Sequence, residues 1–322
     1  MSRYDSGMGR GASAVAGTVL AAMLLAGCAA APAVSPGEPV IDSDFPDPDV
    51  LLVDGTYFAY ATNDAQSNVQ VATSTDLVTW RALPDAFPEL PDWVVPGDTW
   101  APEVSRVGDG YVLYFTAHSA VDDVQCIGTA TSSRPAGPFT ATGDGMLVCP
   151  ADERGAIDAS TFVDGDGARY LLYKNDGNCC GLDTWISAVA LSSDGLALAG
   201  EPTRLIRQDQ EWEGDLVEAP TMVVRDEGYV LFYSANGYAG PDYAIGYATA
   251  AALGGPWTKH DGPWLTSDDT GFVIIGPGGQ DVTGDDDSTL VLHGWDSYLT
   301  YRALYVLPLE WRDGLPVAPS ID

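Results

Sequence analysis

The chain has 322 residues, of which 46% are hydrophobic and 10% aromatic, a composition typical of a globular protein with a sizeable core. It carries 46 acidic against 14 basic residues, a formal net charge of −32 at pH 7. This balance excludes nucleic acid as a partner, because phosphates require clustered Lys and Arg, and it disfavours anionic membrane or polysaccharide surfaces. A neutral substrate or a cation remains compatible with it.

Residues 1–27 have the pattern of an export signal. Two arginines precede an apolar, Ala-rich run over residues 12–26, which is too short for a normal membrane-spanning helix. The tetrapeptide LAGC, ending at Cys28, resembles a bacterial lipobox, in which the cysteine becomes the lipid-bearing first residue. The alternative is an ordinary secretory signal cleaved a few residues later. We expect residues 28–38 to form a tether, and the exported protein to be anchored to the outer face of the membrane only through lipid on Cys28.

Residues 39–322 contain a recurring segment and are expected to form one domain. The copies are DPDVLLVDGTYFAY from Asp47, WAPEVSRVGDGYVLYF from Trp100, DASTFVDGDGARYLLY from Asp158, EAPTMVVRDEGYVLFY from Glu218 and a weaker GPGGQDVTGDDDSTLVLHGW from Gly276. The aromatic residues that close the turns recur about every 55 to 60 residues, a period typical of propeller blades or repeat arrays.

Apolar alternation and turn residues predict strands within each unit. In chain order these are 50–53, 57–62, 68–74 and a start at 79; 111–118 and 126–132; 170–174 and 184–191; 229–235 and 243–249; and 289–295 and 301–307. Short, evenly spaced strands with aromatic and Gly signatures predict an all-β fold, a five-bladed β-propeller. We expect the segment near Ile41 to close the ring by adding a strand to the last blade. Residues 83–95 come nearest to a helical pattern.

Four further cysteines, Cys126, Cys149, Cys179 and Cys180, predict two disulfides in an exported chain, with three possible pairings. We favour Cys126–Cys149 with a vicinal Cys179–Cys180 pair, although each adjacent cysteine can instead reach a different partner. Zinc is disfavoured, because no CxxC pairs occur and the three histidines are scattered.

If the units close around an axis, their first positions converge. Three carboxylates, from Asp47, Asp158 and Glu218, would then share a pocket with the indole of Trp100. Such an arrangement indicates acid–base chemistry rather than packing. We place the nearby acidic residues outside this pocket. Glu103 is left out because the repeat alignment puts Trp100 at the axis, and we expect the surface to hold Glu211, Glu213 and Asp215. The acidic turns at 164–167 and 285–287 read as hairpin turns, since they lack a calcium-binding loop pattern.

Six motifs then identify a family. They are FPDPDV (45–50), STDLVTW (74–80), TWAPEV (99–104), AIDAST (156–161), LVEAPTM (216–222) and YRALYVLPLEW (301–311). Over residues 40–312 the chain resembles glycoside hydrolase family 43, whose members are five-bladed propellers that cleave arabinofuranosides and xylosides with inversion.

The resemblance implies a role for each acid. Asp47 would be the general base that activates water, Glu218 the general acid that protonates the leaving oxygen, and Asp158 the carboxylate that tunes and positions the acid. Inversion requires two carboxyl groups roughly 6.5 to 9.5 Å apart, so that water fits between base and sugar. A neighbouring carboxylate would also supply the raised pKa that an acid needs.

The resemblance also implies a substrate-binding set. Trp100 and Phe45 would line the pocket, and Arg302 would lie near substrate hydroxyls and the acid. His293 resembles an axial histidine that helps some members hold a calcium ion or a water cluster, so a structural calcium is expected there and no cofactor otherwise. The alternatives are core packing for Trp100, Phe45 and His293, and a buried salt bridge for Arg302. Gly279 replaces the histidine or asparagine of many relatives, which puts a polar contact from that turn in doubt.

The sequence therefore predicts an inverting hydrolase, acting as a monomer on α-L-arabinofuranosyl or β-D-xylosyl linkages of neutral hemicellulose or arabinan oligosaccharides. An endo-arabinanase is one alternative, because loops between blades decide exo or endo action. A catalytically inactive, glycan-binding propeller lipoprotein is the other, and it would be expected to lack at least one of the three acids.

Overall fold

The computed structural model describes Met1, residues 37–143 and residues 145–321. The predicted export signal after Met1, Cys28 and most of the tether lie outside these residues. Among the residues described, no helix is long and apolar enough to span a membrane. Four short 3₁₀ helices interrupt the strands: η1 (Ala151–Glu153), η2 (Gly177–Cys180), η3 (Glu211–Glu213) and η4 (Asp285–Asp287).

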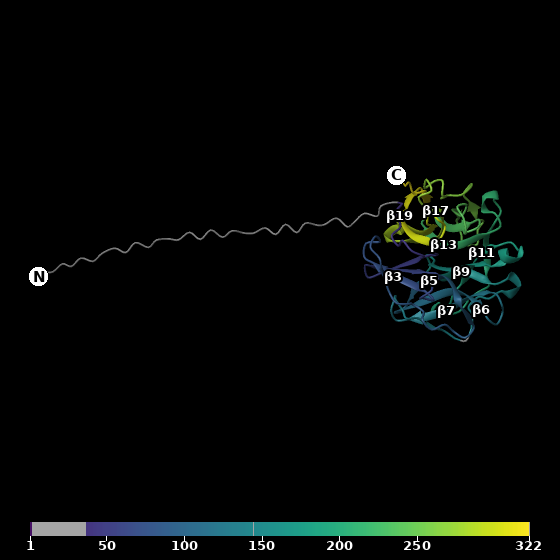
Figure 1. Cartoon of the computed structure of the whole chain (residues 1–322), viewed down its shortest axis with the longest axis horizontal. Coiled ribbons are helices and arrows are strands. Elements are labelled where there is room, and N and C mark those ends of the chain that lie inside the picture. The colour runs from purple at the N-terminus through teal and green to yellow at the C-terminus, as the bar shows by residue number, and fades with distance from the viewer. Residues whose placement is uncertain (2–36, 144, 322) are drawn as a thin grey trace. The chain divides into compact units, whose positions relative to one another are not determined.

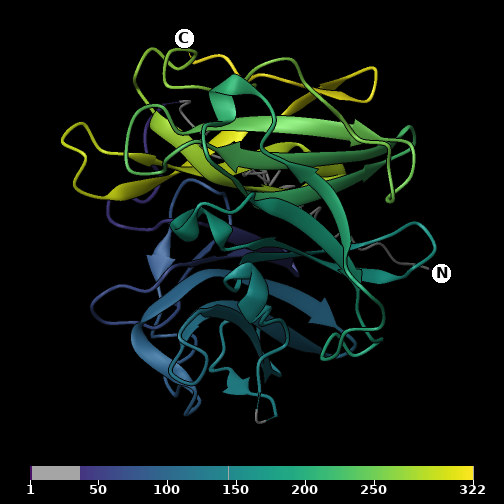
Figure 2. The same cartoon turned by 90° about the vertical axis from the view of Figure 1, so that its right-hand side faces the viewer.

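Strands β1 to β19 form five antiparallel sheets that follow one another around a ring (Figures 1 and 2). The first two blades are β1 (Asp49–Val53), β2 (Thr56–Ala61), β3 (Gln70–Ser74) and β4 (Arg81–Ala82), then β5 (Val94–Val107), β6 (Gly110–Ser119), β7 (Gln125–Ser132) and β8 (Thr140–Ala141). The third and fourth are β9 (Ala156–Val163), β10 (Arg169–Asn175), β11 (Trp185–Ala190) and β12 (Thr203–Arg207), then β13 (Val217–Arg225), β14 (Gly228–Ala235), β15 (Ala244–Ala250) and β16 (Thr258–Lys259).

The fifth blade closes the ring. It contains β17 (Ile275–Thr283), β18 (Thr289–Trp295) and β19 (Arg302–Pro308), and the hairpin β20 (Glu310–Arg312) and β21 (Leu315–Val317) follows. Ile41 pairs antiparallel with Leu304 of β19, and the Val40 N–H donates to the Leu304 carbonyl at 2.8 Å. The start of the domain thus completes the last blade, as predicted.

The five-bladed propeller is confirmed, and every strand boundary predicted from the sequence agrees with the structure to within two residues. Residues 83–95, which came nearest to a helical pattern, form no helix, and β5 begins at Val94. Both favoured disulfides are present, Cys126–Cys149 and Cys179–Cys180.

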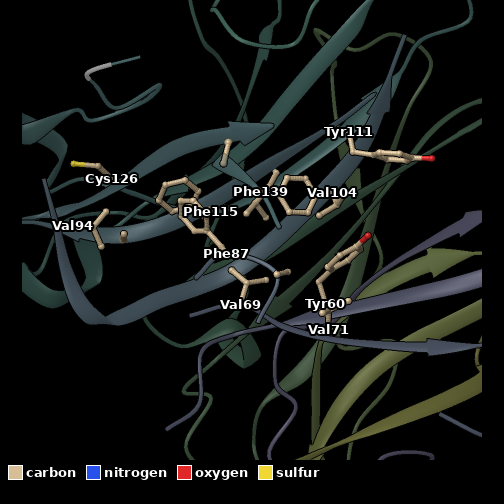
Figure 3. Close-up of a cluster of buried hydrophobic side chains, with 14 of the residues drawn as sticks. Tyr60, Val69, Val71, Phe87, Val94, Val104, Tyr111, Phe115, Cys126 and Phe139 are labelled. Atoms are coloured by element: carbon tan, nitrogen blue, oxygen red, sulfur yellow. The ribbon is translucent and has the colours of Figure 1, made fainter. Parts of the chain in front are cut away.

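Alternation along the strands explains the core. On β6, Leu113 and Phe115 face the first blade, whereas Val112 and Tyr114 face the third. Successive side chains point to opposite faces of a sheet, so a strand between two neighbouring blades is apolar on both sides. Each of the five blade interfaces accordingly has its own apolar cluster. Figure 3 shows the one between the first two blades, where the Phe87 and Phe115 rings lie 4.8 Å apart.

Candidate active site

One residue in each blade adopts a left-handed backbone at the same point of the innermost segment. These residues are Asp47 (φ 54°), Ala101 (φ 40°), Asp158 (φ 57°), Ala219 (φ 50°) and Gly279 (φ 54°). On β5, β9, β13 and β17, the register of the strand pairing shifts beside this left-handed residue, as it does at a β-bulge. A positive φ is strained for a non-glycine residue, and bulges commonly re-aim side chains next to active sites. The bends turn consecutive inner-strand residues toward the propeller axis.

A cavity of about 400 Å³ opens at these bends, within the size range of small-molecule sites. Its lining includes five of the seven residues predicted for the site: Asp47, Trp100, Asp158, Glu218 and Arg302. The structure does not bring Phe45 into this cavity. Phe45 is 4% exposed and packs in the cluster between the fifth and first blades, so core packing is the correct interpretation of this residue.

Asp47 is held in its charged form. Arg302 Nη1 lies 3.0 Å from Asp47 Oδ1, and the Thr62 hydroxyl donates to Oδ2 at 2.7 Å. Burial alone would raise the pKa of Asp47, but the Arg302 guanidinium, together with the Thr62 hydroxyl, holds that pKa well below its usual range. Tyr238 and Trp295 flank Arg302, with ring centroids 5.1 and 5.8 Å from the guanidinium carbon. The carboxylate is therefore ionised at any pH near neutrality.

His293 lies behind Asp47, fully buried, and does not line the cavity. Its Nδ1 accepts the Asp47 backbone N–H at 3.0 Å. Burial lowers the pKa of His293, so the ring is neutral and its proton resides on Nε2, which has no hydrogen-bond partner among the described residues. A protonated Nε2 offers no lone pair to a cation, and calcium prefers oxygen ligands. These residues therefore suit a water molecule better than the calcium ion expected here.

Asp158 and Glu218 form an interacting pair on neighbouring blades. Asp158 Oδ2 accepts the Ala219 backbone N–H at 2.9 Å. Burial, followed by the nearby Glu218 carboxylate, raises the pKa of Asp158 to about 8, and Lys174 offsets only part of this effect. Titration of two such groups belongs to the pair rather than to either residue. The pair therefore retains a proton near neutral pH, in contrast to Asp47.

Glu218 is held at both oxygens by residues that the sequence argument missed. The Tyr243 hydroxyl donates to Oε1 at 2.9 Å, and Lys174 Nζ lies 3.3 Å from Oε2. Lys174 in turn donates to Asn178 Oδ1 at 2.7 Å. The signal available in the sequence was Lys174 itself, a charged residue that directly follows the apolar run at residues 170–173 of β10.

A second ring of acids lies along the same cavity. Asp49 Oδ2 accepts the Val104 N–H, and Asp281 Oδ2 accepts the Val50 N–H, each at 2.9 Å. Glu103, which we had left out, also lines the cavity, and its Oε1 accepts the Thr161 N–H from the third blade. Each carboxyl thus ties its blade to the next. Burial raises the pKa of all three acids, that of Asp281 to about 7.

The expectation that Glu213 lies on the surface was wrong. Its side chain is fully buried and is paired with Lys259, whose Nζ lies 2.6 Å from Oε1. The Tyr233 hydroxyl also donates to Oε1, at 2.8 Å. Glu211 and Asp215 are exposed, as predicted.

A five-bladed propeller whose axial cavity places an ionised carboxylate together with a proton-holding acid pair defines a glycoside-cleaving enzyme. Comparisons with known proteins agree. Residues 36–316 match the family model described as glycosyl hydrolases family 43. The chain belongs to this family and is a glycoside hydrolase.

Three relatives illustrate the similarity. A β-D-galactofuranosidase, xynD, of Aspergillus niger is 28% identical over 290 residues, which cover 84% of this chain and 77% of the relative. An extracellular exo-α-(1→5)-L-arabinofuranosidase of Streptomyces chartreusis is 29% identical over 287 residues, covering 82% and 84%. The crystal structure of a thermostable family-43 glycoside hydrolase matches with a TM-score of 0.74 and 30% identity, over 87% of this chain and 95% of that one.

Proposed function

We propose that this chain hydrolyses α-L-arabinofuranosyl or β-D-xylosyl linkages with inversion, using Asp47 as base, Glu218 as acid and Asp158 to tune the acid. One observation carries the proposal. A single cavity contains a carboxylate held ionised and an acid pair that retains a proton. Titratable groups whose environments push their pKa values apart are the usual sign of an assigned base and acid.

The proposed reaction uses the two sides of the cavity differently. Asp47, ionised and oriented by Arg302, takes a proton from a water that attacks the anomeric carbon. Glu218 gives its proton to the leaving oxygen on the opposite face of the sugar. Asp158 keeps that proton available near neutral pH through the coupling of the two acids. After one turnover the product has the inverted anomeric configuration.

A neutral pentosyl ring suits the lining. Trp100 is partly exposed in the cavity, so its indole can face a sugar ring, and the net charge of −32 disfavours an anionic sugar. The names of the relatives favour furanosyl substrates, five-carbon in the Streptomyces enzyme and six-carbon in the Aspergillus enzyme. The inactive-propeller alternative is disfavoured because all three acids are present and grouped.

The test is hydrolysis of 4-nitrophenyl α-L-arabinofuranoside, β-D-xyloside and β-D-galactofuranoside by the mature protein, beside a Glu218→Gln variant. We expect release from at least one substrate, lost in the variant, and an inverted first product by NMR. A retained configuration would refute the assigned roles. Linear arabinan, with product sizes followed over time, separates exo from endo action. Folded protein that cleaves none of these substrates would support the glycan-binding alternative.

We also propose export and lipid anchoring at Cys28. The similarity to an extracellular relative and the LAGC tetrapeptide support it. In a bacterial host, labelled palmitate is expected on the full chain, and Cys28→Ser is expected to lose the label and shift the protein to the soluble extracellular fraction. An unlabelled wild-type chain, exported and cleaved after another residue, would contradict the anchor.

A further inference from the structure

Lys174 and Lys259 are the two lysines of the chain, and both are buried. Their side chains are 1% and 8% exposed. Burying an ammonium is costly unless it is paired, so each needs a reason to be there. Lys259 pairs with Glu213, and neither residue lines the active-site cavity. Lys174 lines that cavity and pairs with the proposed acid.

Three side-chain oxygens surround the Lys174 ammonium, two as hydrogen-bond acceptors and that of Glu218 as an ion pair. Asn178 Oδ1 lies 2.7 Å from Nζ, Glu218 Oε2 lies 3.3 Å away and Asp176 Oδ1 lies 3.5 Å away. Asn178 belongs to η2, the short helix that also contains the Cys179–Cys180 disulfide. The third blade therefore fixes the ammonium from one side, and the acid completes its coordination from the fourth.

The partners of Glu218 differ in what they accept. An ammonium has three donors and no acceptor, whereas a phenol both donates and accepts. A protonated Glu218 can therefore present its O–H to Tyr243 or to a leaving oxygen, but not to Lys174. Burial and the Glu218 carboxylate raise the pKa of Tyr243 well above its usual value, so Tyr243 remains a phenol. The ammonium 3.3 Å from Oε2 stabilises negative charge on that oxygen, and this favours the proton of Glu218 on Oε1, the oxygen away from Lys174.

We propose that Lys174 is a positioning residue for the acid: its ammonium, held by Asn178, occupies Oε2 of Glu218 and leaves Oε1 as the oxygen that carries the transferable proton. The inference rests on the acid role proposed for Glu218. No bond to Lys174 forms or breaks. The O–H bond at Oε1 breaks as the leaving oxygen takes the proton, and the carboxylate that forms is stabilised by the ammonium beside it.

Leaving groups distinguish this role from a structural one. A 4-nitrophenyl group departs with little help from an acid, whereas a methyl glycoside of the same sugar needs the proton. We expect Lys174→Met to lower kcat on the methyl glycoside by about 10- to 100-fold, less than the roughly 10²- to 10⁴-fold of general acid catalysis, because the acid itself remains. On the 4-nitrophenyl glycoside the loss should stay below about 3-fold, with KM little changed. Asn178→Ala should shift the ratio of the two rates in the same direction by less.

Lys259→Met is the matched control, because it removes an equally buried ion pair outside the cavity. It should lower the melting temperature and leave the ratio of the two rates at the wild-type value. Equal loss on both glycosides in Lys174→Met overturns the proposal, and so does a rise in KM alone, which would mark a substrate ligand. If that variant does not fold, an unchanged ratio in Asn178→Ala overturns it. A wild-type protein that cleaves no glycoside refutes the proposed function itself, a separate result.

Discussion

Arg302 gives the sharpest test of how the cavity controls its base. Replacing it with methionine keeps a long side chain between Tyr238 and Trp295 but removes the charge 3.0 Å from Asp47. Asp47 then keeps its burial and its hydrogen bond from Thr62 but loses its only arginine partner among the ion pairs of the described residues. We expect its pKa to rise.

The magnitude follows from the geometry. At 3.0 Å and an effective dielectric constant of about 20, Coulomb's law gives about 5.5 kcal/mol for the pair. This is an upper bound, because 23% of the Asp47 side chain and 15% of the Arg302 side chain are exposed to solvent in the cavity. Arginine neighbours typically lower an aspartate pKa by about 1 to 3 pH units. The same range is our expectation here, worth about 1.4 kcal/mol per pH unit.

The direction of the pH effect follows from the linkage between proton binding and folding. Because the folded pKa of Asp47 is depressed, the wild-type base stays charged as the pH falls, and its stabilising contribution is lost only at very low pH. In Arg302→Met the base protonates earlier, so the acidic limb of the kcat/KM profile should move up by about 1 to 3 pH units. Arg204→Met, which removes an exposed ion pair with Glu153, should leave the limb in place. Lower activity with an unmoved acidic limb would refute the control of Asp47 by Arg302.

Three further predictions address the surrounding structure. Gly279→Ala should lower the melting temperature and cut kcat by more than about 10-fold, because φ is +54° and a Cβ would lie 2.5 Å from His293 Nδ1 and 3.1 Å from Asp47 Oδ1. Gly165→Ala is the control and should be neutral, because a Cβ there meets nothing within 4 Å. Equal melting temperatures and equal kcat values in the two variants would contradict this prediction. Asp281→Asn should make the stability of the fold less dependent on pH. Because the folded pKa of Asp281 is raised to about 7, its carboxyl contributes stability below the usual carboxyl pKa, and that contribution is lost as the pH rises toward about 7. Melting temperatures equal to those of the wild type at both pH 5 and pH 8 would refute this reasoning. Dialysis against EDTA should change neither activity nor melting temperature, and a loss restored by calcium would show that His293 does help hold a cation.

The propeller was predictable because its information is local and repeated. Each unit carries its own turn residues and its own alternation, and the second strand of the blade begins near Tyr57, Tyr111, Tyr170 and Tyr229 in four of them. The ring closure at Ile41 followed from topology, since an incomplete last blade needs a partner for its edge. Glu213 could not be placed in the same way. Its burial depends on Lys259, 46 residues away, and spacing along the chain does not reveal that pairing.

The site was only partly predictable, for a related reason. Motifs point to individual residues that line the cavity, but the side chains that hold them arrive from distant positions in the chain, on the same blade or on another. Thr62 and Arg302 meet Asp47 from positions 15 and 255 residues away, and Tyr243 reaches Glu218 across its own sheet. Phe45 shows the converse error. It lies two residues before Asp47, yet it packs into the blade interface.

The repeat alignment itself was displaced by one residue in two blades, and the displacement shows how the site is made. It equated Asp47 and Asp158 with Trp100 and Glu218, whereas the structure places Ala101 and Ala219 at the left-handed position. In a regular strand a one-residue offset would turn a side chain to the opposite face. Here Glu218 and Asp158 both line the cavity, because the bulge beside each bend presents consecutive residues to the axis. The same backbone bend, repeated in five blades, thus supplies two rings of inward positions. One ring contains the catalytic candidates Asp47 and Asp158. The other contains the acids that tie the blades together, and this is why charged residues accumulate at the axis of a propeller whose blade interfaces are apolar.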